Sequence, residues 1–598
     1  MSKLSDTLRR IFPASLWSVT TTRLWLLTLL TVLWFDLEWC MIFSFITFQL
    51  PELWVNALLL SLIVMMPQML WRLRRTQAAL STALSLLMLS NLLYARTYFN
   101  AIPASSYLMA GNLADFTASV IDQLRWMDLG FAAIIIMLWI VACRPHKGDA
   151  SLNRHGRRCY WGLLALTAAV SGILLVSRGG LSKAWETLSV YRYYSSRVPM
   201  YTVFGSVTHD LIATTQPLSA AKRAEVDEWM AAQPPLDSLA VPRIDNVVII
   251  LCESLESWPI GLKVQGKEIT PCLNRIVADT TRVFYAPNVV TQVGAGRSID
   301  SQLLFNAGML PLLSGIYATD YADNTYHTLS KALKELRGAR TSILTVDKPH
   351  TWNQQAVARA FGIDTLIANT SWVNDQPVGS KRKLGDRSFA RQIVSRMRSG
   401  ELWPEGSNAY MQIVTYSGHN PFRLPAELDS LHLDPKGLQD ITWRYLTMTH
   451  FTDGAIGTIV DYMRTRPAFD RTLIVIMGDH EGLASDRADA LADKFVSPLQ
   501  LTPLIVINAP RTGRFDTYMG QTDIYPTLLQ MTGLTSYPWH GMGRSVLSPD
   551  FPGVAITPGL EILGDTTAVS PAVMRQLRRA RTISDRIISY DLLAPAQR

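Results

Sequence analysis

Ser298 stands in the segment VGAGRSIDSQ, directly after an arginine that follows two glycines. The nearest nucleotide-binding pattern, G-x-x-x-x-G-K-[ST], requires a glycine at position 291, where this chain has Thr291. A phosphate-binding loop of that type is therefore excluded. Two interpretations of Ser298 remain. It is a nucleophile, with Arg297 beside it to neutralise a phosphate oxygen, or it caps the helix that follows a glycine-rich turn.

Two apolar runs end abruptly in residues that bind metal ions. Glu253 follows VVIILC, and the pair Asp479 and His480 follows LIVIMG. Carboxylate oxygens and an imidazole nitrogen suit a divalent ion such as zinc or manganese. Each feature alone is common, because a glutamate at a strand end is often a helix cap or an ion-pair partner. Together they predict a metal site, and a bound ion would lower the pKa of the Ser298 hydroxyl.

The elements that must position these residues form an alternating pattern. Continuous aliphatic runs, typical of strands covered on both faces, alternate with helical patterns, which predicts an α/β domain with a mostly parallel central sheet. In such sheets ligands bind beyond the carboxyl ends of the strands, where Glu253, Asp479 and His480 would meet. The runs are 246–254, 341–347, 409–417, 472–480 and 502–510, and the helical patterns include 326–336, 443–464 and 523–531.

The first third of the chain is of a different kind. It contains five apolar stretches, each near or somewhat below the roughly 20 residues that cross a bilayer. Five in succession, flanked by arginine and tryptophan, favour membrane helices over buried core helices. The stretches are Leu24–Phe48, Leu53–Leu70, Gln77–Tyr94, Leu129–Cys143 and Tyr160–Val176.

Basic residues set the orientation of these helices, because cytoplasmic loops carry an excess of lysine and arginine. They concentrate before the first stretch and in the loops after the second and fourth, so we expect a cytoplasmic N-terminus. Everything after about Arg178 then lies outside, in a periplasmic or extracellular position. The first stretch is not a cleaved signal, because it is long and leads into further spans. The residues concerned include Lys3, Arg9, Arg10, Arg23, Arg72, Arg74, Arg75, Arg144, Lys147, Arg154, Arg157 and Arg158.

A proline cluster in AAQPPLDSLAVPR marks a linker ahead of the external domain. We therefore expect a transmembrane domain over 1–178, a juxtamembrane linker over 179–243, a catalytic domain over 244–560 and a C-terminal tail over 561–598. The formal net charge of +8 is largely explained by the cytoplasmic loops, and no basic stripe interleaved with aromatic residues predicts nucleic-acid binding.

Two questions stay open in the sequence. Cys252 and Cys272, the external pair among five cysteines, could form a disulfide, although their apolar positions favour two buried thiols. Asp36 and Glu38 lie inside the first apolar stretch, where carboxylates are costly. They have a function there, or they lie at a membrane interface or mark a tilted helix.

Several segments in this order resemble the alkaline phosphatase and sulfatase superfamily. Within it they are similar to the lipoteichoic acid synthase and phosphoglycerol transferase branch, which also has five membrane helices, a linker and an external sulfatase-like domain. The ordered set is specific, whereas any one segment alone is not. The segments are CESLES, TPCLN, TQVGAGRSID, SGHNPF, GDHEG, TPLIVINAP and GQTDIYPTLLQMTG.

The resemblance implies a set of site residues. In that branch the metal, usually manganese, is held by a glutamate, a nucleophilic threonine and an adjacent aspartate and histidine. These match Glu253, Ser298, Asp479 and His480. The head-group pocket of the branch has a tryptophan and a histidine, which match Trp352 and His419; without the resemblance, a core aromatic and a turn histidine would be the simpler interpretations.

The departures from the family pattern narrow the range of reactions and donors that the resemblance implies. Serine replaces threonine as the nucleophile, which is a mild chemical change. Gln354 stands where an arginine usually follows the tryptophan, which weakens the inference that the donor is phosphatidylglycerol. The signal for conversion to formylglycine is missing after Ser298, which disfavours sulfate-ester hydrolysis. The pair of external cysteines also argues mildly against the disulfide-rich phosphoethanolamine transferases.

The sequence therefore predicts a membrane-anchored phosphotransferase that depends on one divalent metal, manganese, with zinc as the alternative. Ser298 would take a phospho-head-group, glycerophosphate or phosphoethanolamine, from a phospholipid in the bilayer and pass it to an external glycan or glycolipid. Arg297 and His419 are the candidates for phosphate and leaving-group contacts. Two alternatives remain: a hydrolase of the same fold that passes the group to water, and a non-catalytic binding module that retains the metal site.

Overall fold

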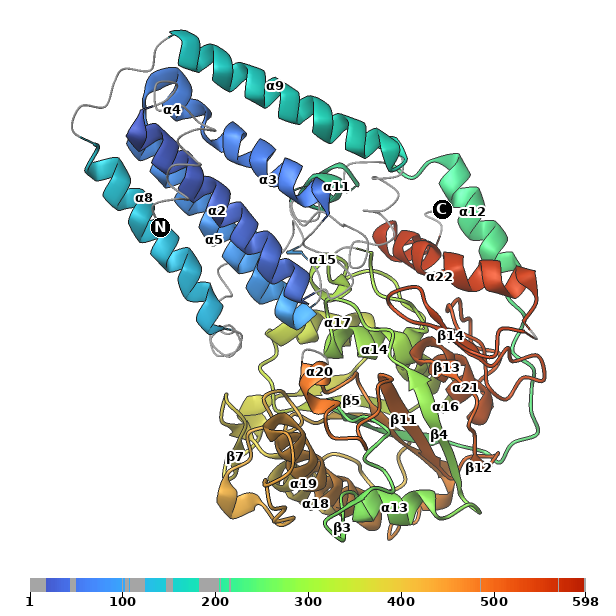
Figure 1. The fold of residues 1–598 in the computed structure, drawn as a ribbon. Helices are drawn as coiled ribbons and strands as arrows, with labels where there is room; N and C mark the ends of the chain where they lie inside the picture. The colour runs from blue at the N-terminus through green and yellow to red at the C-terminus, as the bar shows by residue number, and fades with distance from the viewer. Residues whose placement is uncertain are drawn as a thin grey trace. The chain divides into compact units, whose positions relative to one another are not determined.

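We describe a computed structural model of the protein. In it the chain forms two compact units, Met1–Gln216 and Pro217–Arg598 (Figure 1). The structure describes residues 18–42, 50–98, 101–102, 107, 124–146, 154–181, 204, 206–213, 217–313, 315–483, 486–567 and 569–595. The expected basic residues Lys3, Arg9, Arg10 and Lys147, and residues 182–203, 205 and 214–216 of the expected linker, lie outside these ranges.

The first unit consists of apolar helices, and among its described residues four are long and apolar enough to cross a membrane. Of the five expected spans, the second, Leu53–Leu70, is the one that does not form a single long helix. The stretch Leu53–Leu70 forms two helices that meet at Met65, because Pro67 lacks an N–H and its ring would clash with the carbonyl four residues earlier. The helices are α2 (Val19–Ile42), α3 (Pro51–Val64), α4 (Met66–Trp71), α5 (Arg74–Tyr98), α8 (Leu129–Cys143), α9 (Arg154–Ser177) and α11 (Ser206–Ala213).

One of the two intramembrane carboxylates belongs to a buried ion cluster. Arg96 on α5 donates to Glu38 on α2 at 2.5 Å and to both carboxylate oxygens of Asp128 at 2.8 Å each. Asp128 precedes α8, so this cluster joins three helices in a place where an isolated charge would be costly. Glu38 is thus held in a buried ion-pair contact between helices. Asp36 is also buried, at 2% exposure.

The second unit is built around a mixed sheet whose strand order is β12-β4-β11-β10-β1-β9-β5-β6. The five strands from β10 to β6 are parallel, whereas β11 is antiparallel to both of its neighbours, β10 and β4. The prediction of a mostly parallel sheet is confirmed, with β11 as the exception. The strands are β1 (Asn246–Cys252), β4 (Val283–Val290), β5 (Arg340–Thr345), β6 (Thr365–Ile367), β9 (Ala409–Val414), β10 (Thr472–Gly478), β11 (Leu501–Ile507), β12 (Gly513–Arg514) and β13 (Met519–Gly520), which also pairs with β4.

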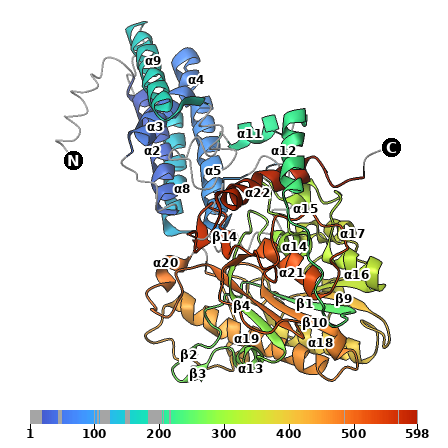
Figure 2. The same cartoon turned by 90° about the vertical axis from the view of Figure 1, so that its right-hand side faces the viewer.

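Helices cover both faces of this sheet, as Figure 2 shows with α18 and α19 below the strands and α14, α16 and α21 above them. The side chains of β1 show why both faces need a cover, because they alternate between two apolar cores. Val248 and Ile250 pack with α13, α18 and α19, while Val247 and Ile249 pack with α16 and α21. The helices are α12 (Ala220–Ala231), α13 (Pro271–Val277), α14 (Ser298–Ala307), α15 (Tyr317–Asp320), α16 (Leu329–Arg337), α17 (Gln354–Ala360), α18 (Asp386–Arg398), α19 (Asp440–Met463), α20 (Arg487–Ala490), α21 (Ile524–Met531) and α22 (Pro571–Ser589).

The two external cysteines are both free thiols in the structure. Cys252 is the last residue of β1 and is fully buried, and burial raises the pKa of its thiol. Cys272 lies on α13 and is partly buried, with its pKa raised to about 11 for the same reason. Both thiols are therefore protonated and unreactive near neutral pH.

The second unit begins at Pro217, within the expected linker, and includes the expected C-terminal tail. The reason is that α12 packs against α22. Trp229 on α12 donates its indole N–H to the carbonyl of Gln576 on α22 at 3.3 Å. Glu225 on α12 binds Arg579 at 2.9 Å and also pairs with Arg586. The helix α22 in turn buries Ile583 and two further isoleucines in an apolar core that includes residues of α14.

Because α22 is part of this core, we expect Ile583→Ala to lower the free energy of unfolding of the external unit by about 2–5 kcal/mol, the usual cost of such a cavity. Arg578→Ala, at an exposed position of the same helix, is the matched control and should be close to neutral. Thermal unfolding of the purified full-length protein measures both. Equal melting temperatures for the two variants would contradict a structural role for α22.

Candidate active site

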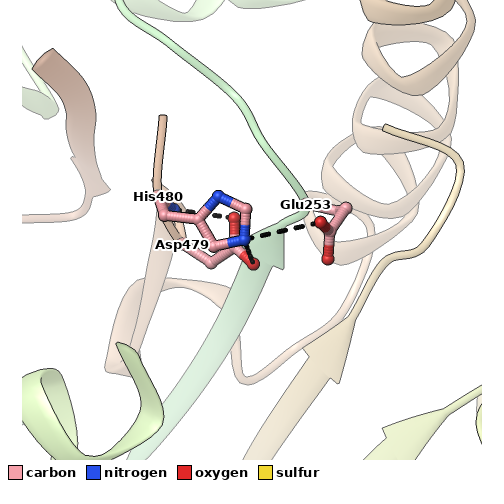
Figure 3. Close-up of side chains that lie close together, drawn as sticks. All are labelled: Glu253, Asp479 and His480. Carbon is pink, nitrogen blue, oxygen red and sulfur yellow. Dashed lines mark hydrogen bonds and ion pairs between the residues drawn. The ribbon is translucent and has the colours of Figure 1, made fainter. Parts of the chain in front are cut away.

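Strand register brings the predicted metal ligands together. The strands β1 and β10 are parallel neighbours, and Cys252 pairs with Gly478, so Glu253 and Asp479 leave the sheet side by side. The Asp479 amide donates to the Cys252 carbonyl at 3.1 Å, and the Ser254 amide donates to Asp479 Oδ1 at 2.7 Å. Figure 3 shows the His480 ring directed at both carboxylates, with Glu253 just beyond the tip of its strand. The two strand ends therefore build one site.

The donor atoms of this site face one another. One ligand atom each from Glu253, Asp479 and His480 lies within 4.8 Å of the other two. His480 Nε2 is 3.6 Å from Glu253 Oε1 and 3.5 Å from Asp479 Oδ2. The other oxygen of Asp479 accepts the amides of Ser254 and His480, each at 2.7 Å, which fixes the carboxylate and leaves Oδ2 directed at the centre.

The His480 ring turns its Nε2 towards the two carboxylates. Its Nδ1 faces away from them, 2.9 Å from the Glu481 carbonyl oxygen and 3.1 Å from a guanidinium nitrogen of Arg297. Burial and then the Arg297 charge lower the pKa of His480, so the ring is neutral near pH 7. Both observations fit Nε2 as the coordinating atom.

Ser298 is the first residue of α14, and its hydroxyl oxygen is part of the same cluster. Oγ lies 3.2 Å from Glu253 Oε2 and 3.2 Å from His480 Nε2. The residue before it, Arg297, occupies the helix-capping position, so the interpretation of Ser298 as the cap does not describe the structure. An anion at this hydroxyl would lie at the positive end of the helix dipole.

The loop before Ser298 is held by a buried carboxylate. Asp300 Oδ2 accepts the amides of Gly294 and Gly296, each at 2.9 Å. A Cβ on Gly296 would come within 2.4 Å of Asp300 Oδ1, so this position requires glycine. Arg297 follows with φ 49° and ψ −115°, a conformation that costs about 1–3 kcal/mol in a residue other than glycine. The strain indicates that the loop is shaped to present its next residue, Ser298.

Arg297 is directed at a residue that the sequence analysis did not single out. Its guanidinium donates to Glu481 Oε1 at 2.5 Å and to the Glu481 carbonyl at 3.2 Å. Both side chains are largely buried, with 15% and 7% exposure, and the Arg297 charge lowers the pKa of Glu481. The only sequence signal for Glu481 was its place in GDHEG, directly after the two ligands.

A divalent cation fits the charge of this site. Burial and then the neighbouring Asp479 carboxylate raise the pKa of Glu253, because two carboxylates share a small buried space. Arg297 offsets this only in part, since its guanidinium is paired with Glu481. A bound divalent ion would neutralise both carboxylates and accept the Nε2 lone pair, so the donor set suits manganese or zinc.

The sequence model of the Sulfatase family matches residues 245–534, and that of the lipoteichoic acid synthase N-terminal domain matches residues 1–195. The chain belongs to the lipoteichoic acid synthase-like branch of the alkaline phosphatase and sulfatase superfamily. It is thus a membrane-anchored phosphotransferase of the phosphoglycerol and phosphoethanolamine transferase type, with an external catalytic unit and a metal-dependent family chemistry.

Individual relatives agree with this placement. The lipoteichoic acid synthase of Staphylococcus saprophyticus is 23% identical over 488 residues, 78% of this chain and 74% of that protein. The lipoteichoic acid synthase-like YvgJ of Bacillus subtilis is 23% identical over 490 residues, 78% of this chain and 77% of that protein. The crystal structure of the lipoteichoic acid synthase LtaP from Listeria monocytogenes superimposes with a TM-score of 0.50 at 15% identity, over 63% of this chain and 99% of that chain.

Two positions matched to the head-group pocket of this lipoteichoic acid synthase-like branch lie less directly in the site. His419 is partly buried and follows Gly418, whose backbone lies against the carbonyl of Glu253. Trp352, with φ 53°, packs against the apolar core that contains Ile299, the residue after Ser298. The structure thus brings Glu253, Ser298, Asp479, His480 and Arg297 into direct contact and His419 close by, while Trp352 lies against the underlying core.

Gln354, which stands where the branch usually has an arginine, has a structural role. The Gln354 side chain is buried and exchanges two amide hydrogen bonds with Gln302 on α14, at 2.9 and 3.1 Å. Gln302 also accepts from Gln412 on β9 at 3.0 Å. Gln354 therefore anchors the helix of the nucleophile candidate instead of offering a charge to a substrate.

The ion pair between Arg297 and Glu481 leads to a prediction about the affinity of the site for Mn²⁺. Glu481→Gln should weaken binding of Mn²⁺ by at least about 30-fold, because an uncompensated guanidinium repels the ion, and even two unit charges about 4 Å apart interact by about 4 kcal/mol at an effective dielectric of about 20. Arg297→Gln combined with Glu481→Gln removes both charges and should restore most of the affinity. Calorimetric Mn²⁺ titration of the three proteins measures this. Additive losses in the double variant would contradict the pairing.

The lowered pKa of His419 leads to a prediction about how the stability of the protein depends on pH. Burial lowers its pKa to about 4, below the ordinary value of about 6.5. A depressed folded-state pKa gives stability that is present above pH 6.5 and is lost as the pH falls towards 4. We expect the wild type to lose more thermal stability over that window than His419→Gln, which keeps an amide donor but does not titrate. Parallel loss in the two proteins would show that His419 does not cause it.

Proposed function

We propose that this phosphotransferase moves a phospho-head-group from a membrane phospholipid to a hydroxyl of an external glycan or glycolipid, through a covalent intermediate on Ser298. The observation that carries the proposal is the position of Ser298 Oγ, 3.2 Å from both Glu253 Oε2 and His480 Nε2, at the N-terminus of α14. A serine in this position has its reacting oxygen among metal-ligand candidates and at a favourable place for a developing negative charge.

In the first half of the reaction Ser298 Oγ attacks the phosphorus of the phospholipid. The bond from phosphorus to the diacylglycerol oxygen breaks, and diacylglycerol leaves with the proton that the serine hydroxyl loses. A divalent cation held by Glu253, Asp479 and His480, manganese with zinc as the alternative, would supply the lowered pKa of that hydroxyl and neutralise phosphate charge. An anchored enzyme suits this step, because both the donor and the diacylglycerol stay in the bilayer.

In the second half an acceptor hydroxyl attacks the same phosphorus, the bond to Ser298 Oγ breaks, and the acceptor's proton returns to the serine. His419 is suited to orient this hydroxyl. Its Nδ1 lies 2.6 Å from the Asn420 carbonyl and so carries the hydrogen, which leaves Nε2 as an acceptor. With a pKa of about 4 the ring is uncharged near pH 7, so it orients a hydroxyl rather than neutralising phosphate.

The charges near His419 favour glycerophosphate over phosphoethanolamine as the transferred group. The Tyr416 ring stacks on the His419 ring, with ring centres 5.8 Å apart. The Lys383 ammonium lies 4.3 Å from the centre of the Tyr416 ring and pairs with Asp347. An ammonium head group would meet a like charge here, which Asp347 offsets in part, whereas a neutral glycerol would not.

The test follows diacylglycerol and head-group release from liposomes by full-length protein with Mn²⁺. We expect turnover with phosphatidylglycerol to exceed that with phosphatidylethanolamine, Ser298→Ala to lose it by at least a thousandfold, and Ser298→Thr to keep part of it. Ser301→Ala is the matched control, because its hydroxyl is buried on the same helix and makes no hydrogen bond in the described structure. Full activity in Ser298→Ala would refute the proposal, and head group released only into water, with acceptor present, would indicate the hydrolase.

A further inference from the structure

An apolar groove lies in the first unit, between the broken span formed by α3 and α4 and the helix α5. Its volume is about 490 Å³. The groove is open to its surroundings, since Ile63 is 47% exposed and Leu80 43%. In a membrane-spanning unit these surroundings are lipid, so the groove is suited to an acyl chain. All the described residues that line it are apolar, and they include Ile63, Met66, Trp71, Leu80, Leu84 and Leu87.

The order of the helices places this groove in the cytoplasmic leaflet. The external unit follows α9, and α5, α8 and α9 are each long and apolar enough to cross the membrane once, so α5 begins on the cytoplasmic side. Leu87, the lining residue farthest along α5, comes thirteen residues after Arg74, which is about 20 Å along the helix axis. One leaflet with its head groups has about the same thickness.

Positive charge is concentrated at the cytoplasmic end of the groove. Trp71 lines the groove, and Arg72, Arg74 and Arg75, the groove arginines, follow it in the short connection to α5 and in the first turn of that helix. All three are exposed, and within the described residues their guanidinium groups make no ion pair and no hydrogen bond. Over residues 53–114 the sequence has no aspartate or glutamate that would neutralise them.

The start of α5 adds to this positive potential. The helix has 25 residues, and the positive end of its dipole lies at the groove arginines. Helix N-termini and guanidinium groups both favour phosphate oxygens, and basic pockets between transmembrane helices on the cytoplasmic side bind anionic phospholipid head groups. A free phosphate would leave the groove empty. A zwitterionic lipid would fill the groove but would bring its own ammonium to the arginines.

We propose that the first unit binds one anionic phospholipid of the cytoplasmic leaflet, with an acyl chain in this groove and its phosphate on Arg72, Arg74 and Arg75. The lipid covers the place where Pro67 breaks the second span, and it holds α3 and α4 against α5. It is not the donor of the transferase reaction, because that reaction takes place in the external unit. The inference therefore does not depend on which head group the enzyme transfers.

The first test measures lipid retention by the full-length protein in detergent, by native mass spectrometry. The probes are phosphatidic acid, which has no head group to transfer, and phosphatidylcholine with the same acyl chains. We expect the wild type to prefer phosphatidic acid by roughly tenfold or more, since each basic side chain near a membrane surface contributes to holding anionic lipid. The preference should disappear in the triple variant Arg72→Gln, Arg74→Gln, Arg75→Gln.

A matched triple variant controls for the total charge. It is Arg23→Gln, Arg144→Gln, Arg158→Gln, which removes three exposed arginines that do not line the groove and lie outside α4 and α5. This control should retain phosphatidic acid as the wild type does. Equal retention of the two lipids by the wild type, or the same loss in both triple variants, would overturn the proposal, because the positive charge would then act without a specific site.

The second test fills the groove. Ala83→Trp adds a large ring at an exposed lining position of α5, whereas Leu86→Trp adds the same ring at an exposed position of that helix outside the groove. We expect roughly tenfold weaker retention of phosphatidic acid in Ala83→Trp and no change in Leu86→Trp. Without lipid both variants should melt near the wild-type temperature, and phosphatidic acid should raise the Tm of Leu86→Trp but not of Ala83→Trp. Equal retention by Ala83→Trp and the wild type would overturn the proposal.

Discussion

The pairing of β1 with β10 is the contact on which the active site depends. Because Cys252 pairs with Gly478, the backbone delivers Glu253 and Asp479 to the same edge at the same height, and the Ser254 amide then fixes the Asp479 carboxylate. The surrounding backbone is packed too closely to allow another arrangement. A Cβ on Gly418 would lie 2.1 Å from the Glu253 carbonyl oxygen, and one on Gly478 would lie 2.0 Å from that of Leu255.

Electrostatics explain why the remaining groups surround this edge. Burial and then the Asp479 carboxylate raise the pKa of Glu253. A bound cation would relieve this, since no lysine or arginine side chain lies between the two carboxylates in the described part of the site. Arg297 stays close but is held by Glu481, so it adds little net charge until a phosphate arrives. The N-terminus of α14 contributes a further positive potential at Ser298. Ser298 Oγ thus lies both among the candidate ligands for a cation and at the positive end of a helix.

Part of this site could be predicted from the sequence, because the expected strands end in residues that bind metal ions. Parallel buried strands carry their carboxyl ends to one edge, so the sequence alone predicted that Glu253, Asp479 and His480 lie together. Ser298 was already a candidate nucleophile from its glycine-rich segment, and the family resemblance matched it to the metal-binding set. The direction of β11 could not be predicted, because a continuous apolar run has no polarity pattern. Glu481 was missed because its role follows from where the Arg297 guanidinium points. The packing of α12 on α22 was missed because Glu225 and Arg579 are far apart in the chain and meet only through tertiary structure.

The central claim is that Ser298 carries the phospho-head-group during transfer, and intact-mass measurement tests it most directly. Full-length protein is incubated with phosphatidylglycerol vesicles and Mn²⁺ without acceptor, quenched in acid and weighed by mass spectrometry, with fragmentation to locate any adduct. The account predicts a glycerophosphoryl adduct on Ser298 in the wild type and in Ser301→Ala, and none in Ser298→Ala. Diacylglycerol production with no adduct at any quench time, or an adduct on another residue, would contradict it.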